Sequence, residues 1–375
     1  MNNHIKKLIP LSEPDLHPKD LKYIKECIDS GWVSSSGPLV EKFEKKLLSF
    51  CNRKEAIAVV NGSSALLIAI KSLNLPKGTL VAVPDWTFAA SVNAIIHAGL
   101  EPIFIDINIH NWCIDEEQLE VCLKKFKKKI SAVLFVNALG NMPDIKKLKK
   151  LSKIYGFSLI EDAAGALGSK KGNYISWSNG DLSIFSFNAN KTLTTGGGGA
   201  VLTNKSSLSK KIRYLITQAR DGQNYNHGDV GYNFKMPNIN AALGLAQAEK
   251  LDVMIKRKQT IARTYYKFLK NYNLFTFMPV HNFSEHSCWM SCLKFNKTRD
   301  LSSLETYLKK KNIIVRTFWN SLSGQKPFKK YLKMKTTISN ALSKKVLSLP
   351  SSSNLKKNEQ RRIINEIISW CNDRS

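Results

Sequence analysis

The segment Ser186-Phe-Asn-Ala-Asn-Lys191-Thr-Leu-Thr-Thr-Gly-Gly-Gly-Gly199 decides the fold of this chain. An apolar run, residues 182–187, leads into it and a second, residues 199–203, follows it, which predicts a strand, a tight loop and another strand. The loop is too short for a crossover helix, so the second strand must run antiparallel to the first. Lys191 lies on this loop between two predicted buried strands, where loss of water favours the neutral amine that attacks carbonyl groups.

Two segments nearer the N-terminus add the other groups of a site. The apolar run 157–161 delivers Asp162 at its C-terminal end, where open parallel sheets place their ligands. Residues 57–70 predict a strand, a turn and an apolar helix, and a helix that begins at Gly62 and Ser63 is suited to bind a phosphate. Pyridoxal 5'-phosphate requires a binding site for its phosphate, a carboxylate for its ring nitrogen and a lysine for covalent attachment.

Short motifs recur along the whole chain in a fixed order. They are Ile9-Pro-Leu-Ser12, Ser30-Gly-Trp-Val-Ser34, Gly37-Pro38 with Phe43-Glu44, Asn61-Gly-Ser-Ser-Ala-Leu66, Pro84-Asp-Trp-Thr-Phe88, Glu161-Asp-Ala-Ala164, Phe185-Ser-Phe187 with Lys191, Gly231-Tyr-Asn233 and Ala241-Ala242. With these motifs in this order, the chain resembles the DegT/DnrJ/EryC1/StrS sugar aminotransferases. These are pyridoxal-phosphate enzymes of fold type I that aminate nucleotide-linked keto sugars.

The resemblance implies a role for each residue of the cofactor site. Lys191 would bond to the cofactor and also move the proton during transamination, and Asp162 would pair with the ring nitrogen. Gly62 and Ser63 would bind the phosphate at the helix N-terminus, and Ser186 would add a further hydroxyl. The related 3-dehydratases carry histidine in place of the reactive lysine, so Lys191 argues against that reaction.

Further positions follow from the same resemblance. Phe88 falls where the family stacks an aromatic ring on the cofactor; Trp86 either faces the same way or belongs to the core. Asn233 matches the position from which a second subunit reaches the cofactor phosphate, and Lys235 is a rival for that contact. A homodimer with shared active sites is therefore expected.

Other positions concern the substrate. Arg316 and Trp319 would face it from the small domain. The chain departs from many relatives at Gly165, where they have Gln, His or Glu, and at 137–140, where they often read His-x-Tyr-Gly. These departures bear on substrate contacts rather than on the cofactor.

The alternation of strand-like and helical runs predicts the fold class. The strand-like runs are 56–60, 80–84, 102–106, 131–137, 157–161, 182–187 and 199–203, and the helical runs are 63–73, 89–98, 116–125 and 144–155. This order predicts an α/β protein with a mostly parallel sheet between two helical layers. The resemblance makes it a three-layer, aspartate-aminotransferase-like fold with seven strands and a smaller α+β C-terminal domain.

The rest of the chain completes the domain plan. Residues 1–30 are predicted to be an N-terminal arm with a helix over 18–29, residues 31–250 the large cofactor-binding domain, and residues 251–375 the small domain. One long helix, roughly 239–269, should link the two domains. The small domain should hold strands at 291–295 and 313–315 and a terminal helix over 356–371.

Composition limits the other classes of function. The 57 Lys and Arg outnumber the 29 Asp and Glu, a net charge of +28 that fits nucleic-acid or membrane-surface binding, or simply a lysine-rich surface suited to an anionic substrate. The lysines are spread over helices without interleaved aromatics, which favours the lysine-rich surface. No membrane span or signal peptide is expected, and seven scattered cysteines predict reduced thiols in the cytoplasm and no metal site.

Together these features predict a cytoplasmic, pyridoxal-phosphate-dependent transaminase of nucleotide-linked 4-keto-6-deoxy sugars. The amino donor is expected to be L-glutamate, and the 4-amino sugar product would serve surface glycans such as lipopolysaccharide. Amination at C3 is the first alternative. A non-catalytic sensor with the same fold and a basic nucleic-acid binder are the others, and the presence of both Lys191 and Asp162 disfavours the sensor.

Overall fold

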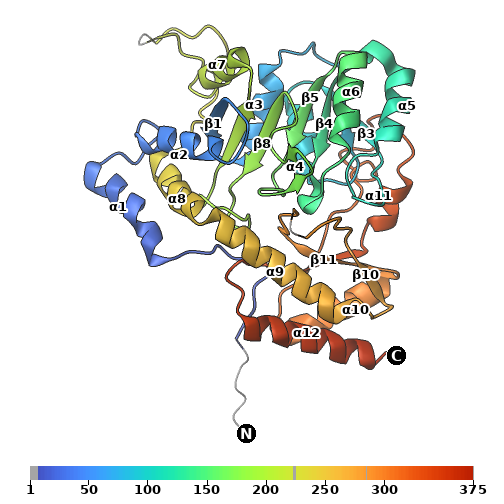
Figure 1. Ribbon diagram of the computed structural model, residues 1–375. Coiled ribbons are helices and arrows are strands. Elements are labelled where there is room, and N and C mark those ends of the chain that lie inside the picture. Colours follow the sequence, from blue (N-terminus) through green and yellow to red (C-terminus); the bar gives the residue numbers. More distant parts are fainter. Residues whose placement is uncertain (1–6, 223–224, 284, 375) are drawn as a thin grey trace.

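A seven-stranded sheet forms the centre of the larger part of the protein (Figure 1). The computed structural model describes residues 7–222, 225–283 and 285–374. In spatial order the strands are β1 (Glu55–Val59), β9 (Gly199–Thr203), β8 (Leu182–Ser186), β5 (Ser158–Asp162), β4 (Ile130–Val136), β2 (Leu80–Pro84) and β3 (Glu101–Ile105). All seven begin and end within one residue of the predicted bounds.

The direction of β9 is the one the short loop requires. β9 pairs antiparallel with both of its neighbours, β1 and β8, whereas the other pairs of the sheet are parallel. Ser186 at the end of β8 pairs with Gly199 at the start of β9, so the intervening loop folds back at the C-terminal edge of β8. The predicted mostly parallel sheet is therefore confirmed.

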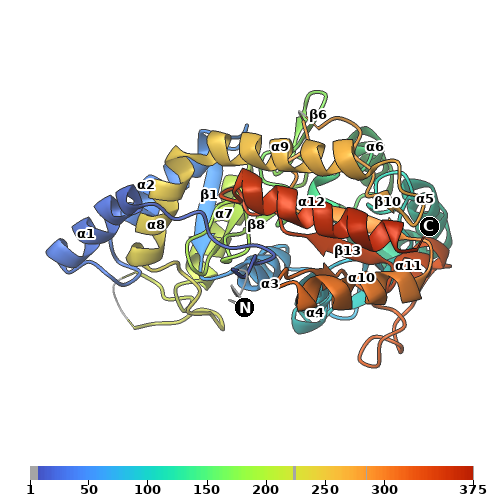
Figure 2. The same cartoon turned by 90° about the horizontal axis from the view of Figure 1, so that it is seen from below.

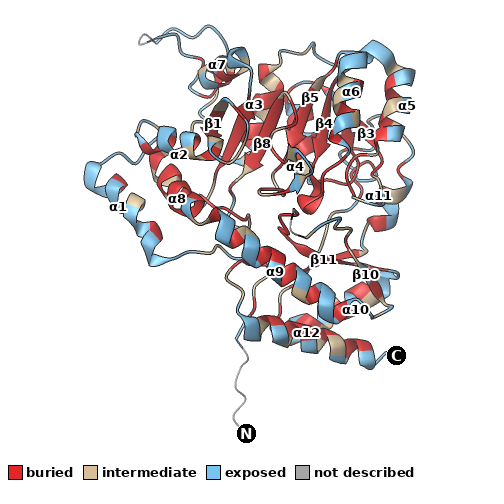
Figure 3. Ribbon diagram, in the orientation of Figure 1, coloured by how far each residue is buried: buried red, intermediate tan, exposed pale blue. Residues whose placement is uncertain are grey.

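Helices cover both faces of this sheet, as the nearly continuous burial along its strands requires. Ile57 and Val59 pack with α3 (Gly62–Ser72), α4 (Ala89–His97) and α7 (Ser206–Leu215). Ala56 and Ala58 point to the other face, where α2 (Leu39–Leu48) and α8 (Asn238–Glu249) pack. Farther along that face lie α5 (Glu116–Phe126) and α6 (Ile145–Tyr155). Figure 3 shows the buried sheet between helices whose outer sides are exposed, so the predicted three layers are confirmed.

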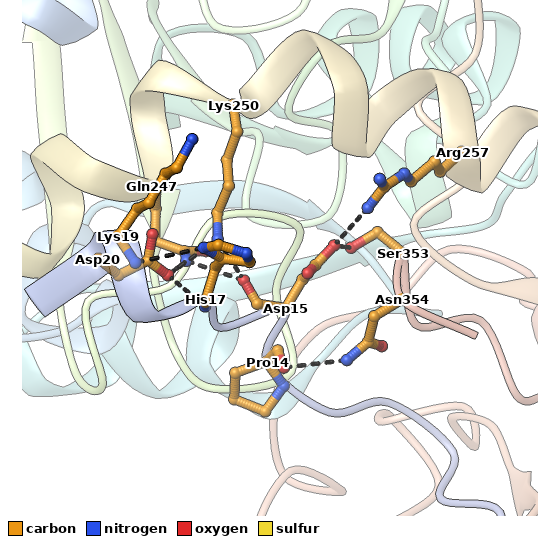
Figure 4. A network of polar contacts seen from close by, with 10 residues as sticks. All are labelled: Pro14, Asp15, His17, Lys19, Asp20, Gln247, Lys250, Arg257, Ser353 and Asn354. Atoms are coloured by element: carbon orange, nitrogen blue, oxygen red, sulfur yellow. Dashed lines mark hydrogen bonds and ion pairs between the residues drawn. The ribbon is translucent and has the colours of Figure 1, made fainter. Parts of the chain in front are cut away.

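The long linking helix predicted over 239–269 is wrong in one respect, because it is two helices. α8 ends at Glu249 and α9 (Leu251–Leu269) follows, with Lys250 between them at φ −110° and ψ 10°. The Lys250 ammonium binds the Asp20 carboxylate at 2.8 Å and the Asp15 carbonyl at 2.7 Å (Figure 4). No glycine or proline marks the break, and the polar partners of Lys250 lie more than 200 residues away. The helical pattern of the sequence therefore runs across residue 250 without interruption.

The C-terminal region is built around a second, antiparallel sheet. In spatial order its strands are β10 (Phe275–Phe277), β11 (Ser291–Phe295), β13 (Val346–Leu349) and β12 (Arg316–Thr317). Leu293 and Leu347 pack with α9, α10 (Thr298–Lys310) and α12 (Lys357–Asn372), and Figure 2 shows α12 between α9 and α10. The helix α11 (Thr337–Leu342) and the two-stranded ribbon of β6 (Lys170–Lys171) and β7 (Tyr174–Ile175) complete these elements.

The strand predicted at 313–315 is wrong, and the N-terminal arm explains why. Ile313 forms only an isolated parallel bridge, with Ile9. The strand of the sheet begins at the next residue after the predicted range and covers Arg316–Thr317. Ile9 is fully buried in the C-terminal core, while α1 (Leu21–Ser30), preceded by the short helix at Pro18–Asp20, packs on α8. The arm thus contacts both parts of the protein, and the domain division near residue 250 stays a prediction.

Candidate active site

A cavity of about 460 Å³ lies at the C-terminal edge of the large sheet, against the start of β11 and β12 of the small one. Its walls come from eight separate parts of the chain. Of the predicted cofactor residues it brings together Gly62, Ser63, Phe88, Asp162, Ser186 and Lys191. Asn233 does not line it. The predicted substrate residues Arg316 and Trp319 form part of the opposite wall.

Lys191 reaches this cavity from the loop between β8 and β9. Backbone hydrogen bonds from Lys191 to the Asn188 carbonyl at 2.9 Å and from Thr195 to the Phe187 carbonyl at 3.0 Å close the loop into tight turns. Lys191 as a whole residue is half-buried, and its ammonium nitrogen lies 3.7 Å from the centre of the Trp289 ring. Burial lowers the pKa of Lys191 to about 8, an effect that the charge of Asp162 opposes. Neutral and protonated amine therefore coexist near neutral pH.

Asp162 ends β5 and is buried at the cavity wall. Its Oδ2 accepts a hydrogen bond from Ser91 Oγ at 2.7 Å, and its Oδ1 accepts one from the Ala164 N–H at 3.1 Å. Burial raises the pKa of the Asp162 carboxyl, whereas these two hydrogen bonds and the charge of Lys191 lower it. A cationic ring nitrogen would compensate the buried carboxylate, which is the partner that the cofactor offers.

The neighbouring carboxylate has a different task because successive strand residues face opposite sides. Glu161 is fully buried away from the cavity. Its oxygens accept hydrogen bonds from the side chains of Asn137, Asn179 and Ser183 and from the backbone N–H groups of Trp177 and Asn179. Glu161 therefore organises the loops beneath the site, and the sequence offered no signal for this network.

The N-terminus of α3 provides a cradle that suits a phosphate. The Asn61 side chain accepts the Ser64 N–H at 2.7 Å, which leaves the N–H groups of Gly62 and Ser63 for a ligand. A Cβ atom at Gly62 would lie 2.8 Å from the Cβ of Ser186, so glycine is needed for the helix to approach β8. Gly62, Ser63 and Ser186 thus converge on one corner of the cavity, as the phosphate requires.

The two aromatic residues of the 84–88 motif have separate positions. Phe88, the residue before α4, is 59% exposed and lines the cavity. Trp86 is fully buried, packs against Trp112 and Trp319, and donates its indole N–H to the Trp319 carbonyl at 2.9 Å. Of the two readings for Trp86, core residue is therefore the correct one.

The residues proposed for the cross-subunit contact lie together outside this cavity. Asn233 is exposed and pairs with Thr217 in an isolated bridge. Lys235 lines a second groove, of about 710 Å³, with Trp32 and the Glu44–Arg213 ion pair among its walls. A contact from either residue to a neighbouring subunit stays a prediction.

Several cavity residues carry no motif that could have revealed them. Trp289 and Phe318 come from the C-terminal region. Ser91, which donates a hydrogen bond to Asp162 from behind the cavity wall, is a single serine within α4 that no motif marks. Among the described residues, no group of three His, Cys, Asp or Glu side chains could hold a metal ion. In the same part of the chain, no helix is long and apolar enough to cross a membrane.

These features define a fold-type-I aminotransferase: the fold itself, the lysine on the β8–β9 loop, the buried Asp162 and the cradle at Gly62. Comparison with known proteins identifies the family. The sequence model of the DegT/DnrJ/EryC1/StrS aminotransferase family matches residues 14–368, and the chain belongs to this family of pyridoxal-phosphate-dependent enzymes.

Individual relatives match over most of their length. GDP-perosamine synthase of Vibrio cholerae is 36% identical, covering 97% of this chain and 100% of the relative. The UDP-4-amino-4,6-dideoxy-N-acetyl-beta-L-altrosamine transaminase of Campylobacter jejuni is 31% identical over 75% of this chain and 74% of the relative. A crystal structure of a putative PLP-dependent aminotransferase from Bacillus cereus superimposes with a TM-score of 0.86 at 26% identity, covering 96% of this chain and all of that one.

Proposed function

We propose that this enzyme transfers an amino group from L-glutamate to C4 of a nucleotide-linked 4-keto-6-deoxy hexose, in the cytoplasm, for surface-glycan biosynthesis. The observation that carries the proposal is the cavity in which Lys191 and Asp162 meet the cradle at Gly62. The end-to-end likeness to GDP-perosamine synthase supports a nucleotide sugar as the substrate, with GDP as the first nucleotide to test. The name of the Campylobacter relative, a 4-amino-4,6-dideoxy sugar transaminase, supports C4.

The residues of the cavity divide the work of holding the cofactor. Gly62, Ser63 and Ser186 would bind its phosphate, Asp162 its ring nitrogen, and Phe88 one face of its ring. Pyridoxal phosphate, when bound, supplies an electron sink and carries the amino group between the two substrates. The buried Asp162 carboxylate would keep the ring nitrogen protonated, which the electron sink requires.

Lys191 would both attach the cofactor and transfer protons. Its pKa of about 8 lets the amine release and regain a proton near neutral pH, which suits a general acid–base group. The apolar side chains of Leu139, Trp289 and Phe318 around it would limit the access of water.

The opposite wall fits an anionic, ring-shaped substrate. Arg316 offers a guanidinium at the cavity and Trp319 an aromatic surface beside it. The net charge of +28 would attract a nucleotide diphosphate by long-range electrostatics. We assign the nucleotide sugar to this side and the cofactor phosphate to the Gly62 side.

The test is a substrate panel. Purified enzyme with pyridoxal phosphate and glutamate is incubated with GDP-, UDP- and dTDP-linked 4-keto-6-deoxy sugars, and products are detected by mass spectrometry. Amination of one of them, with NMR placing nitrogen at C4, supports the proposal, whereas amination only of the corresponding 3-keto sugars, incubated in parallel, supports the alternative. The proposed substrate class is wrong if the enzyme is folded, binds the cofactor and consumes glutamate but aminates none of these sugars. Lys191→Ala is the inactive control.

A further inference from the structure

Trp289, just before β11, is held so that its indole faces Lys191. The side chain is only 5% exposed, and the ring centre lies 3.7 Å from the Lys191 ammonium nitrogen. The indole N–H donates to the carbonyl of Asn190, the residue before the lysine, at 2.8 Å. One end of the indole is therefore tied to the same loop that carries Lys191.

The backbone of Trp289 is fixed from the other side. Lys258 of α9 is buried and donates to the Trp289 carbonyl at 3.3 Å and to the Ser351 carbonyl at 2.6 Å. Phe318 makes an edge contact with the indole at 6.1 Å between ring centres. Side chain and main chain of Trp289 are thus both restrained, so the position of the ring is a built feature of the site.

Gly165 leaves the space that the indole occupies. A Cβ atom added at Gly165 would lie 2.8 Å from Cε3 and 3.1 Å from Cζ3 of Trp289. The φ of Gly165 lies outside the positive range that favours glycine, in contrast to Gly168 at +93°. Glycine is therefore required at position 165 by the neighbouring ring and not by its own backbone conformation.

We propose that Trp289 is a positioning residue for Lys191, and that its indole face is the resting place of the lysine whenever the amine is free and protonated. Among the described residues the Lys191 ammonium has no hydrogen-bond acceptor, so the ring is its direct partner. The proposal rests on the proposed function in that a transaminase frees this lysine during each cycle. The proposal assigns to Trp289 the role of holding the free Lys191 amine at the cavity wall, where the amine can bond to the cofactor again.

A desolvated cation on an indole face is stabilised enough to raise the proton-binding constant about tenfold, or one pKa unit. Burial acts in the opposite direction on the pKa of Lys191. The charged groups around the amine are Asp162 at the end of β5 and Arg316 of β12, with Lys258 behind the Trp289 carbonyl. None of these is altered by a change at position 289, so the ring can be tested alone.

The test measures the pKa of Lys191 in the full-length protein stripped of cofactor. Trace acetylation across pH 6 to 10, with quantification of the Lys191 peptide by mass spectrometry, reports the protonation of this one amine. Trp289→Phe and Trp289→Leu both lose bulk, but only the first keeps an aromatic face. We expect the pKa of Lys191 to be about one unit higher in Trp289→Phe than in Trp289→Leu. Phe88→Leu removes another aromatic ring from the same cavity and should leave this pKa unchanged.

A second measurement tests Gly165. Gly165→Ala should lower Tm when Trp289 is present and have little effect when Trp289→Leu is also present, because the collision is then relieved. Equal pKa values for Lys191 in the Phe and Leu variants, or a higher value in the Leu variant, would overturn the role of the ring. If Trp289→Leu does not fold, Trp289→Met takes its place in the comparison. Neither measurement needs a sugar substrate, so a failure of the proposed sugar specificity would leave both readable.

Discussion

Replacing Asp162 with Asn separates the charge of this residue from its shape. The chain gives the carboxylate two hydrogen bonds, from Ser91 Oγ and from the Ala164 N–H, and an amide can keep both by using its oxygen and its NH₂ group. What is lost is the charge opposite the ring nitrogen. A charge-assisted hydrogen bond becomes a neutral one, which weakens cofactor binding by about 1 kcal/mol or more, and the rate should fall by two or more decades, roughly 100-fold.

Without cofactor the same substitution should have the opposite effect on stability. Because burial raises the pKa of Asp162 in the folded state, the ionised carboxylate destabilises the fold at neutral pH, and this penalty disappears as the pH falls below the unfolded value. We therefore expect cofactor-free Asp162→Asn to melt above the wild type at pH 7, with the two converging in acid. Thermal melting over this pH range, beside kcat and the cofactor Kd, supplies the data.

Glu161→Gln is the matched control, because it removes the next carboxylate along the same strand. It disturbs a buried hydrogen-bond network that includes Asn137 at the cavity wall, at a cost of about 1–3 kcal/mol in stability, while leaving the Asp162 carboxylate and its two hydrogen bonds intact. The folded Glu161→Gln enzyme should keep its turnover. Near-normal turnover in Asp162→Asn, or an equal loss in both variants, would refute the assignment of Asp162 to the ring nitrogen.

Three further predictions concern attachment, assembly and pH. Borohydride treatment of the yellow, cofactor-loaded enzyme should leave the cofactor covalently on the peptide that contains Lys191; a label on another peptide contradicts the site. Co-expressed Lys191→Ala and Asn233→Ala subunits should regain part of the activity that each variant lacks alone, because one of the two sites in each mixed dimer is intact. If Asn233→Ala is active alone, Lys235→Ala takes its place in this experiment. Burial lowers the pKa of Lys258 from 10.5 to about 8. As the pH rises from 8 to 10.5, the free energy of unfolding of the wild type should therefore increase relative to that of Lys258→Met, by up to about 3 kcal/mol. Parallel stability curves for the two proteins across that range would contradict this prediction.

The large sheet could be predicted from the sequence because its strands are buried on both faces. Each appears as a short apolar run between glycines, polar turns and helical patterns, and Leu80–Pro84 and Gly199–Thr203 have their predicted bounds. The break at Lys250 and the strand at Arg316–Thr317 were missed because distant segments determine them. Local patterns carry no information on these partners, because Asp20 lies 230 residues from Lys250 and Ser348 lies 32 residues from Arg316.

The cofactor side of the cavity was predictable for a related reason. Gly62, Asp162 and Lys191 each lie where a strand ends and a turn begins, and such positions are visible in the sequence as changes of pattern. On the opposite wall, Arg316 and Trp319 were expected only from the family resemblance, and Trp289 and Phe318 were missed because they look like ordinary core residues. Their role comes from the packing of the C-terminal sheet against the large one.

The segment Pro84 to Phe88 combines residues that anchor the fold with residues that line the cavity. Phe88 faces the cavity, but Asp85 accepts the Ser323 N–H at 2.6 Å and a hydrogen bond from the Ser321 hydroxyl, and Trp86 donates to the Trp319 carbonyl. Two of the five residues therefore fasten the chain segment that carries the substrate wall onto the C-terminal end of β2.

Asp106, one residue after β3, holds the start of α11, since it accepts the N–H groups of Ile338 and Ser339 at 2.7 and 2.8 Å, and Ile338 shares an apolar cluster with the wall residues Phe318 and Trp319. The opposite wall is thus anchored to the edges of the same sheet that positions Lys191 and Asp162. Because buried carboxylates bonded to backbone N–H groups are costly to separate, the distance between this wall and Lys191 is set by the sheet itself. Substitutions at Asp85 or Asp106 would for this reason act on substrate binding through geometry, although neither residue touches the cavity.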